Sequence, residues 1–190
     1  MKEKLTLRNV IILSAALIAV VVFALSFLVR GCIEMEGGKY IFTFAVYRPL
    51  EVIGIENGHT EVIDLRKYDT VTFALPLIGV ILTLLSAVAA FVTVFVVKDE
   101  KVAKIALLVC GGLTVVGGVF QFFVGETALR TFVNIESGSL EKLDWVREKL
   151  REMGGKYYTG GLGIVDAVLA ILAGCAFAVA PFLPEKKLAK

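Results

Sequence analysis

Two polar side chains interrupt long apolar stretches of this 190-residue sequence, Asp166 and Gln121. A carboxylate inside a membrane span is expensive to bury, and it commonly marks a path for protons or cations. Asp166 follows the start of its stretch by about one turn, so the lipid headgroups or the helix N-terminus could satisfy it instead. Gln121 suits a hydrogen bond between helices, and a pore-lining role is its alternative. We treat Asp166 and Gln121 as one candidate intramembrane polar site and expect them to meet.

Other reactive residue types are sparse and scattered. His59 is the single histidine, and with Glu56 and Glu61 nearby it gives only a weak metal signal, so we interpret it as a solvated turn residue. The cysteines lie far apart in the sequence, at Cys32, Cys110 and Cys175. This spacing provides neither a Cys-x-x-Cys redox pair nor a disulfide between loops. We predict no catalytic residue, no cofactor and no metal site.

One stretch looks like a protease motif. Residues 161–166 resemble the Gly-x-Gly-Asp motif of intramembrane aspartyl proteases, but Asp166 is displaced by two positions and no second intramembrane aspartate completes a dyad. A Gly-x-Ser-x-Gly elbow and a phosphate loop are also missing. An enzyme is therefore the third reading of this chain, and it would need a cluster formed between loops.

The elements that position these residues are four apolar stretches, at 10–30, 71–97, 105–124 and 161–184. Each is long enough to cross a hydrocarbon core as a helix, because backbone amides find no water there. The first could alternatively be a cleaved signal peptide, with Ala24-Leu25-Ser26 as the cleavage site, but it is longer than an ordinary h-region. A lipoprotein signal at Cys32 is disfavoured by Arg30. We expect a four-transmembrane-helix bundle.

Lysine and arginine residues predict the orientation. They predominate over acidic residues in the short segments 1–9, 98–104 and 185–190, whereas the longer segments 31–70 and 125–160 carry balanced charge. Because basic segments stay in the cytoplasm, we expect both termini inside and both long loops outside the cell membrane. The net charge of +2 gives no reason to expect nucleic-acid binding.

The first extracellular loop carries strand signals. Residues 40–46 are rich in aromatic and β-branched types, and the runs 51–55 and 61–65 flank Asn57-Gly58, the pair most suited to a tight hairpin turn. We predict a small antiparallel sheet of at least three strands with a hairpin turning at Asn57-Gly58. The protein is thus a membrane all-α protein with a small β component.

The second extracellular loop predicts a short amphipathic helix over 139–153. Its apolar face is formed by Leu140, Leu143, Val146, Leu150 and Met153. Gly154-Gly155 ends it. Since its charges are balanced, we expect it to cover the sheet, and an interfacial helix lying in the membrane is the alternative.

Small residues recur on the third and fourth spans, where they let helices approach closely. The predicted helix-packing face comprises Gly111, Thr114, Gly118, Gln121, Gly125, Gly163, Ala167, Ala170 and Gly174. An interface between copies of the chain is the alternative use of this face. Aromatic residues in the loops form a candidate partner-contact surface: Tyr40, Phe42, Phe44, Trp145, Tyr157 and Tyr158.

These features predict a non-enzymatic tetraspan protein whose ordered extracellular loops contact other proteins, as an accessory subunit or a surface-assembly component. A small oligomeric transporter or channel using Asp166 and Gln121 is the alternative. The layout resembles the claudin-like tetraspan architecture, but the first loop has no Trp and only Cys32, so that family's signature is missing. Few Asn and Gln beside many Lys and Glu indicate a thermophilic prokaryote.

Overall fold

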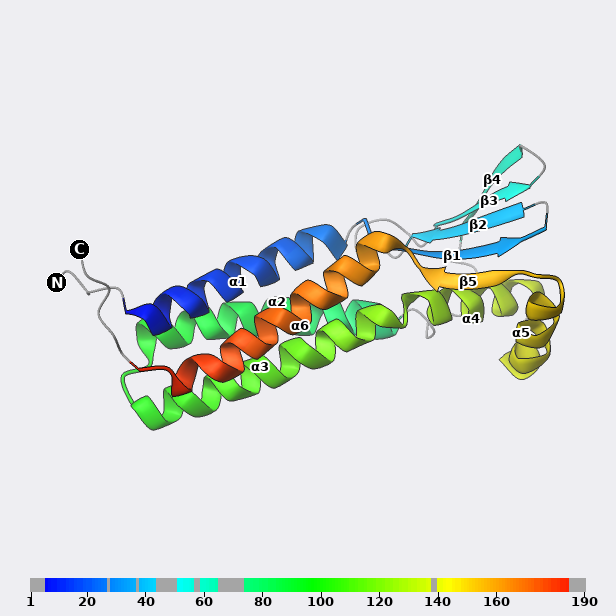
Figure 1. Ribbon diagram of the computed structural model, residues 1–190. Coiled ribbons are helices and arrows are strands. Elements are labelled where there is room, and N and C mark those ends of the chain that lie inside the picture. Colours follow the sequence, from blue (N-terminus) through cyan, green and yellow to red (C-terminus); the bar gives the residue numbers. More distant parts are fainter. Residues whose placement is uncertain are drawn as a thin grey trace. The chain divides into compact units, whose positions relative to one another are not determined.

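Four long apolar helices dominate the computed structural model (Figure 1). It describes residues 6–26, 28–36, 38–43, 51–56, 59–64, 74–137 and 140–184. The four helices are α1 (Leu7–Ser26), α2 (Ala74–Val96), α3 (Glu100–Phe122) and α6 (Gly161–Val179), and the short 3₁₀ helix η4 (Ala180–Phe182) follows α6. Each is long and apolar enough to cross a membrane. The four predicted spans are confirmed as helices in the part of the chain that the structure describes.

The helix ends differ from those predicted, most clearly in α1 and α3. α1 ends at Ser26, and Arg30, which we placed in the span, begins a strand. α3 begins at Glu100, five residues before the predicted start at 105, because Asp99 caps it. The Oδ1 atom of Asp99 accepts hydrogen bonds from the backbone N–H groups of Lys101 (2.8 Å) and Val102 (3.2 Å). The link between α2 and α3 is therefore only 97–99.

One compact unit contains most of the four long helices, and we call it the helical unit. It consists of the described residues of Met1–Ala24, Gly79–Val119 and Ala167–Lys190. Its core consists largely of alanines, among them Ala15, Ala19, Ala90 and Ala173, with Phe177 as the largest fully buried side chain. Large apolar residues such as Leu17 and Phe95 point outward. Small residues inside and large ones outside are typical of helices packed in lipid.

Glycines bring α3 and α6 close together. A Cβ atom on Gly111 would lie 2.7 Å from the carbonyl oxygen of Gly174, and one on Gly118 would lie 2.9 Å from that of Ala167. Thr114, Ala167 and Ala170 are also buried. These residues of the predicted face therefore pack within the chain, and its use between copies stays an untested alternative.

The second compact unit, Leu25–Ile78 and Phe120–Asp166, is called the α/β unit. Its five-stranded sheet has the order β4-β3-β2-β1-β5, and neighbouring strands are antiparallel. The strands are β1 (Arg30–Met35), β2 (Gly38–Thr43), β3 (Glu51–Glu56), β4 (His59–Asp64) and β5 (Lys156–Thr159). The prediction of at least three strands is confirmed, but β1 and β5 were not predicted.

The predicted hairpin forms between β3 and β4. Glu56 pairs with His59, so the connection contains only Asn57 and Gly58, which lie outside the described residues. His59 begins a strand, two residues earlier than the predicted start at 61. The strand expected at 40–46 begins at Gly38, and its positions 44–46 lie outside the described residues.

Helix α4 (Val124–Ser137), which was not predicted, covers the sheet. It lies along β1 and β5 (Figure 1). Its buried residues Ala128, Leu129 and Val133 form one core with Ile33 of β1 and Leu150. We expected the helix at 139–153 to cover the sheet. That segment forms η3 (Leu140–Lys142) and α5 (Leu143–Glu152), and α5 packs against α4.

The glycine contacts predict unequal effects of one substitution at neighbouring positions. Gly111→Leu would drive its side chain into the α6 backbone, so we expect a loss of about 1–3 kcal/mol in unfolding free energy. Gly112→Leu is the matched control, because a Cβ atom there meets nothing within 4 Å. Thermal unfolding in detergent micelles measures the difference, and equal melting temperatures for the two variants would contradict the close α3–α6 packing.

Candidate functional site

Asp166 is the sixth residue of α6, and its relative exposure is 0%. Neither carboxylate oxygen has a hydrogen-bond partner among the described residues. Free backbone N–H groups occur in the first turn of a helix, and Asp166 lies beyond that turn. Its side chain is also too buried to reach the lipid headgroups. A buried carboxylate without such a partner is a candidate for binding a proton or a small cation, and this role of Asp166 stays a prediction.

Gln121, the other member of the predicted polar site, is 1% exposed and bonded elsewhere. Its Nε2 atom donates a hydrogen bond to the carbonyl oxygen of Pro76 in α2, at 3.4 Å. The expected pairing of Gln121 with Asp166 is therefore not formed as a hydrogen bond. Gln121 instead links α3 to α2, the interhelical role considered for it.

Most other buried polar side chains of the spans bond to their own helix. Thr83, Thr93 and Thr114 each donate to the carbonyl oxygen four residues earlier, at 2.7 to 3.0 Å. Such bonds satisfy a hydroxyl without any contribution from another helix. Within the described part of the spans, Ser86 Oγ has no hydrogen-bond partner either, but the serine hydroxyl carries no charge.

The remaining predicted packing residues lie where α4 and α6 begin. A Cβ atom on Gly125 would lie 2.6 Å from the backbone of Tyr158, and the Gly125 N–H donates to Thr159 Oγ1 at 2.9 Å. Gly163 lies against the side chains of Thr159 and Val29. These glycines allow β5 to pass directly over helix backbones.

The predicted contact aromatics divide between core and surface. Tyr40 and Tyr157 pack in the core under α4, and the ring centroid of Tyr40 lies 5.1 Å from that of Phe132. Phe42 pairs with Gly31 and Val52 in the sheet. Phe44 lies outside the described residues. Among the four of these aromatic residues whose side chains the structure describes, Trp145 on α5 is the exposed one, with 59% exposure.

Tyr158 belongs to a polar cluster that was not predicted, formed with Glu34, Lys39 and Lys156. Glu34 Oε1 accepts hydrogen bonds from Lys39 Nζ and the Tyr158 hydroxyl, both at 2.6 Å, and Lys156 Nζ lies 3.0 Å from Glu34 Oε2. The hydrogen bond from Lys39, with those from Tyr158 and Lys156, lowers the pKa of Glu34 to about 2. The same contacts raise the pKa of Lys39 and of Lys156.

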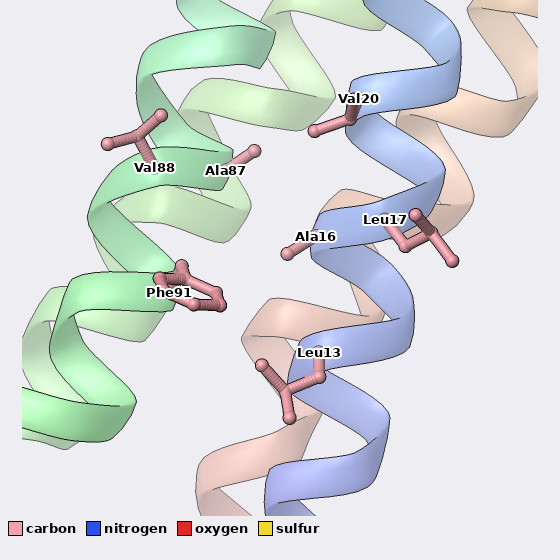
Figure 2. Close-up of a pocket in the computed structure, with 7 residues that line it drawn as sticks. All are labelled: Leu13, Ala16, Leu17, Val20, Ala87, Val88 and Phe91. Carbon is pink, nitrogen blue, oxygen red and sulfur yellow. The ribbon is translucent and has the colours of Figure 1, made fainter.

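An apolar groove of about 330 Å³ separates α1 from α2 within the helical unit (Figure 2). Its lining consists of Leu13, Ala16, Leu17, Val20, Ala87, Val88 and Phe91. No side chain there can donate or accept a hydrogen bond, so the groove has no chemistry by which to select a ligand. Acyl chains of the bilayer can fill it.

No group of three or more His, Cys, Asp or Glu residues in the described ranges is placed to hold a metal ion. The cysteines Cys32, Cys110 and Cys175 form no disulfide bond.

No protein-family model matches this sequence, and a search of curated proteins finds no significant match. Four spans and a separate α/β unit are thus the basis for assigning a role. The chain is a multi-pass membrane protein.

The Glu34 cluster predicts a pH-dependent stability. Because the pKa of Glu34 is lowered from 4.5 to about 2, its contribution is present above about pH 4.5 and is lost as the pH falls toward 2. We expect wild type to melt at a higher temperature than Glu34→Gln at pH 6, and this difference to shrink between pH 4.5 and pH 2. Glu152→Gln, which removes the exposed ion pair with Lys149, is the control. A pH-independent difference for Glu34→Gln would contradict the network.

Proposed function

We propose that this chain is a non-enzymatic tetraspan protein of the cell membrane whose α/β unit contacts other proteins outside the cell. It would act as an accessory subunit of a membrane complex or as a component of a surface assembly. The basic residues near the α2–α3 link, Lys98, Lys101 and Lys104, support a cytoplasmic position for that link. The termini would lie on the same side as the link.

The composition of the sheet supports a shared side for both long loops. β1 comes from the segment between α1 and α2, and β5 from the segment between α3 and α6, yet the two strands pair from Gly31–Thr159 to Glu34–Lys156. Hydrogen-bonded strands must lie on one side of the bilayer. The chain between them therefore has to cross the membrane an even number of times, which α2 and α3 provide.

The observation that carries the contact role is Trp145, the only tryptophan, exposed on a firmly held helix. Leu150 on the same helix is 3% exposed and joins the core of the α/β unit. Arg147 connects α5 to α4 through Glu126, with an Nη2–Oε1 distance of 2.6 Å. A large aromatic group on an ordered element loses little entropy on binding, and tryptophan is enriched among residues that dominate interface energies.

Asp166 favours a second function, transport of protons or small cations. Its complete burial without a hydrogen-bond partner among the described residues is the supporting observation. A single intramembrane charge is sparse for a solute path through one chain, so this function would require assembly of several copies. The contact role does not involve Asp166.

One experiment separates the two functions. The complex is solubilised gently, its mass is measured, and its components are identified for wild type, Trp145→Ala and Asp166→Asn. The contact role predicts that a partner is recovered in fixed ratio with the wild-type protein. Trp145→Ala should lower the affinity for this partner roughly tenfold or more, as for interface hot spots, whereas Asp166→Asn should leave the affinity unchanged.

Lys149→Ala is the matched surface control, because Lys149 lies one turn from Trp145 and forms an exposed ion pair with Glu152. Recovery of a homo-oligomer without other subunits would contradict the contact role with other proteins. Ion flux into vesicles that Asp166→Asn abolishes would then establish transport.

A further inference from the structure

A second hollow, of about 390 Å³, lies within the α/β unit where two spans end. Its lining consists of Leu28, Cys32, Lys39, Ile41, Gly160, Gly161 and Leu162. Leu28 follows α1 by two residues, and Gly161 and Leu162 are the first residues of α6. Both helices are membrane spans, so the hollow opens at the level where hydrocarbon gives way to headgroups.

Lys39, the charged residue in this lining, belongs to a cluster with a surplus positive charge. Lys39 and Lys156 share one carboxylate, that of Glu34, so the cluster of these three side chains has a net charge of +1. The Lys39 ammonium uses one N–H donor for Glu34 (2.6 Å) and one for the Tyr158 hydroxyl (3.2 Å). An ammonium group has three donors, so these two bonds to described residues leave a third for a ligand.

The rest of the lining is largely apolar. Leu28 and Leu162 are about half exposed, and Ile41 contributes a further apolar side chain from β2. A Cβ atom on Gly161 would meet nothing within 4 Å. The lining thus combines a cation with aliphatic groups, which match the phosphate and the acyl chains of a membrane lipid.

We propose that this hollow binds the phosphate headgroup of an anionic membrane lipid, with Lys39 contacting the phosphate and Leu28 and Leu162 contacting the upper acyl chain. A free anion would match Lys39 but would leave the aliphatic side unused. The proposal is independent of the contact role, since it involves neither Trp145 nor the outward face of α5.

The test measures lipid retained by the full-length protein. Protein is reconstituted in nanodiscs of phosphatidylcholine with phosphatidylglycerol, released into the gas phase, and scored for bound phosphatidylglycerol by native mass spectrometry. Gly161→Phe adds a large side chain to the lining at a position where a Cβ atom meets nothing within 4 Å, and Lys39→Gln removes the cation. We expect Gly161→Phe to lose the retained lipid, and Lys39→Gln to lower its affinity roughly fivefold, the factor that one lysine contributes at an anionic surface.

Each variant has a matched control. Gly112→Phe adds the same side chain in open space on α3, and Lys149→Gln removes a lysine that is also paired with a carboxylate. Both controls are expected to retain wild-type amounts of lipid. Wild-type retention by Gly161→Phe or by Lys39→Gln would overturn the proposal. Displacement of the lipid by soluble glycerol phosphate at equal concentration would overturn it as well, since the site would then recognise a free anion.

Discussion

The close approach of α3 and α6 is the interaction on which the rest of the structure depends. In a bilayer the hydrophobic effect does not drive helices together, so association depends on packing between backbones. Gly111, Gly118 and Gly174 allow this approach, because a side chain at each position would collide with the facing helix. The alanine-rich core around Phe177 continues the same principle into α1 and α2. The buried threonines of the spans bond to their own helices, whereas the Asp166 carboxylate has no hydrogen-bond partner among the described residues.

The α/β unit shows how two separate chain segments produce one fold. The segment before α2 supplies β1 to β4, and the segment after α3 supplies α4, α5 and β5. Neither part is complete alone, since β1 would lose an edge partner and Ile33 would lose the cover of α4. Mutual completion of this kind requires the spans between the segments to return the chain to the same side of the membrane. Membrane topology and sheet topology therefore constrain each other.

The sequence predicted the features that depend on local pattern. The four spans follow from apolar length, and the β3–β4 hairpin follows from Asn57-Gly58 between two β-rich runs. β1 escaped prediction because Arg30–Met35 directly follows an apolar span and carries no alternation of its own. β5 has only four residues, and it is a strand because β1 pairs with it. The apolar residues Val124, Ala128, Leu129 and Val133 have the spacing of a helix, which begins at the predicted end of the third span.

The candidate sites were predictable by residue type but not by environment. Burial of Asp166 and the linking role of Gln121 agree with their positions in apolar spans, whereas the bond from Gln121 to Pro76 depends on how α2 and α3 pack. Tyr157 and Tyr158 looked alike in the sequence. Neighbouring residues of a strand point to opposite faces, so Tyr157 joins the core while Tyr158 binds Glu34. Which face is covered depends on α4, which lies elsewhere in the chain.

The most direct test of this account is the side of the membrane on which each segment lies. In a background without native cysteines, single cysteines at Glu36, Glu152 and Lys98 are exposed to a membrane-impermeant maleimide in intact cells. The account predicts labelling from outside at Glu36 and Glu152, because their segments form one sheet-based unit, and labelling at Lys98 only after the cells are opened. Labelling of Lys98 from the same side as Glu36, or of Glu36 and Glu152 from opposite sides, would contradict the four-span topology.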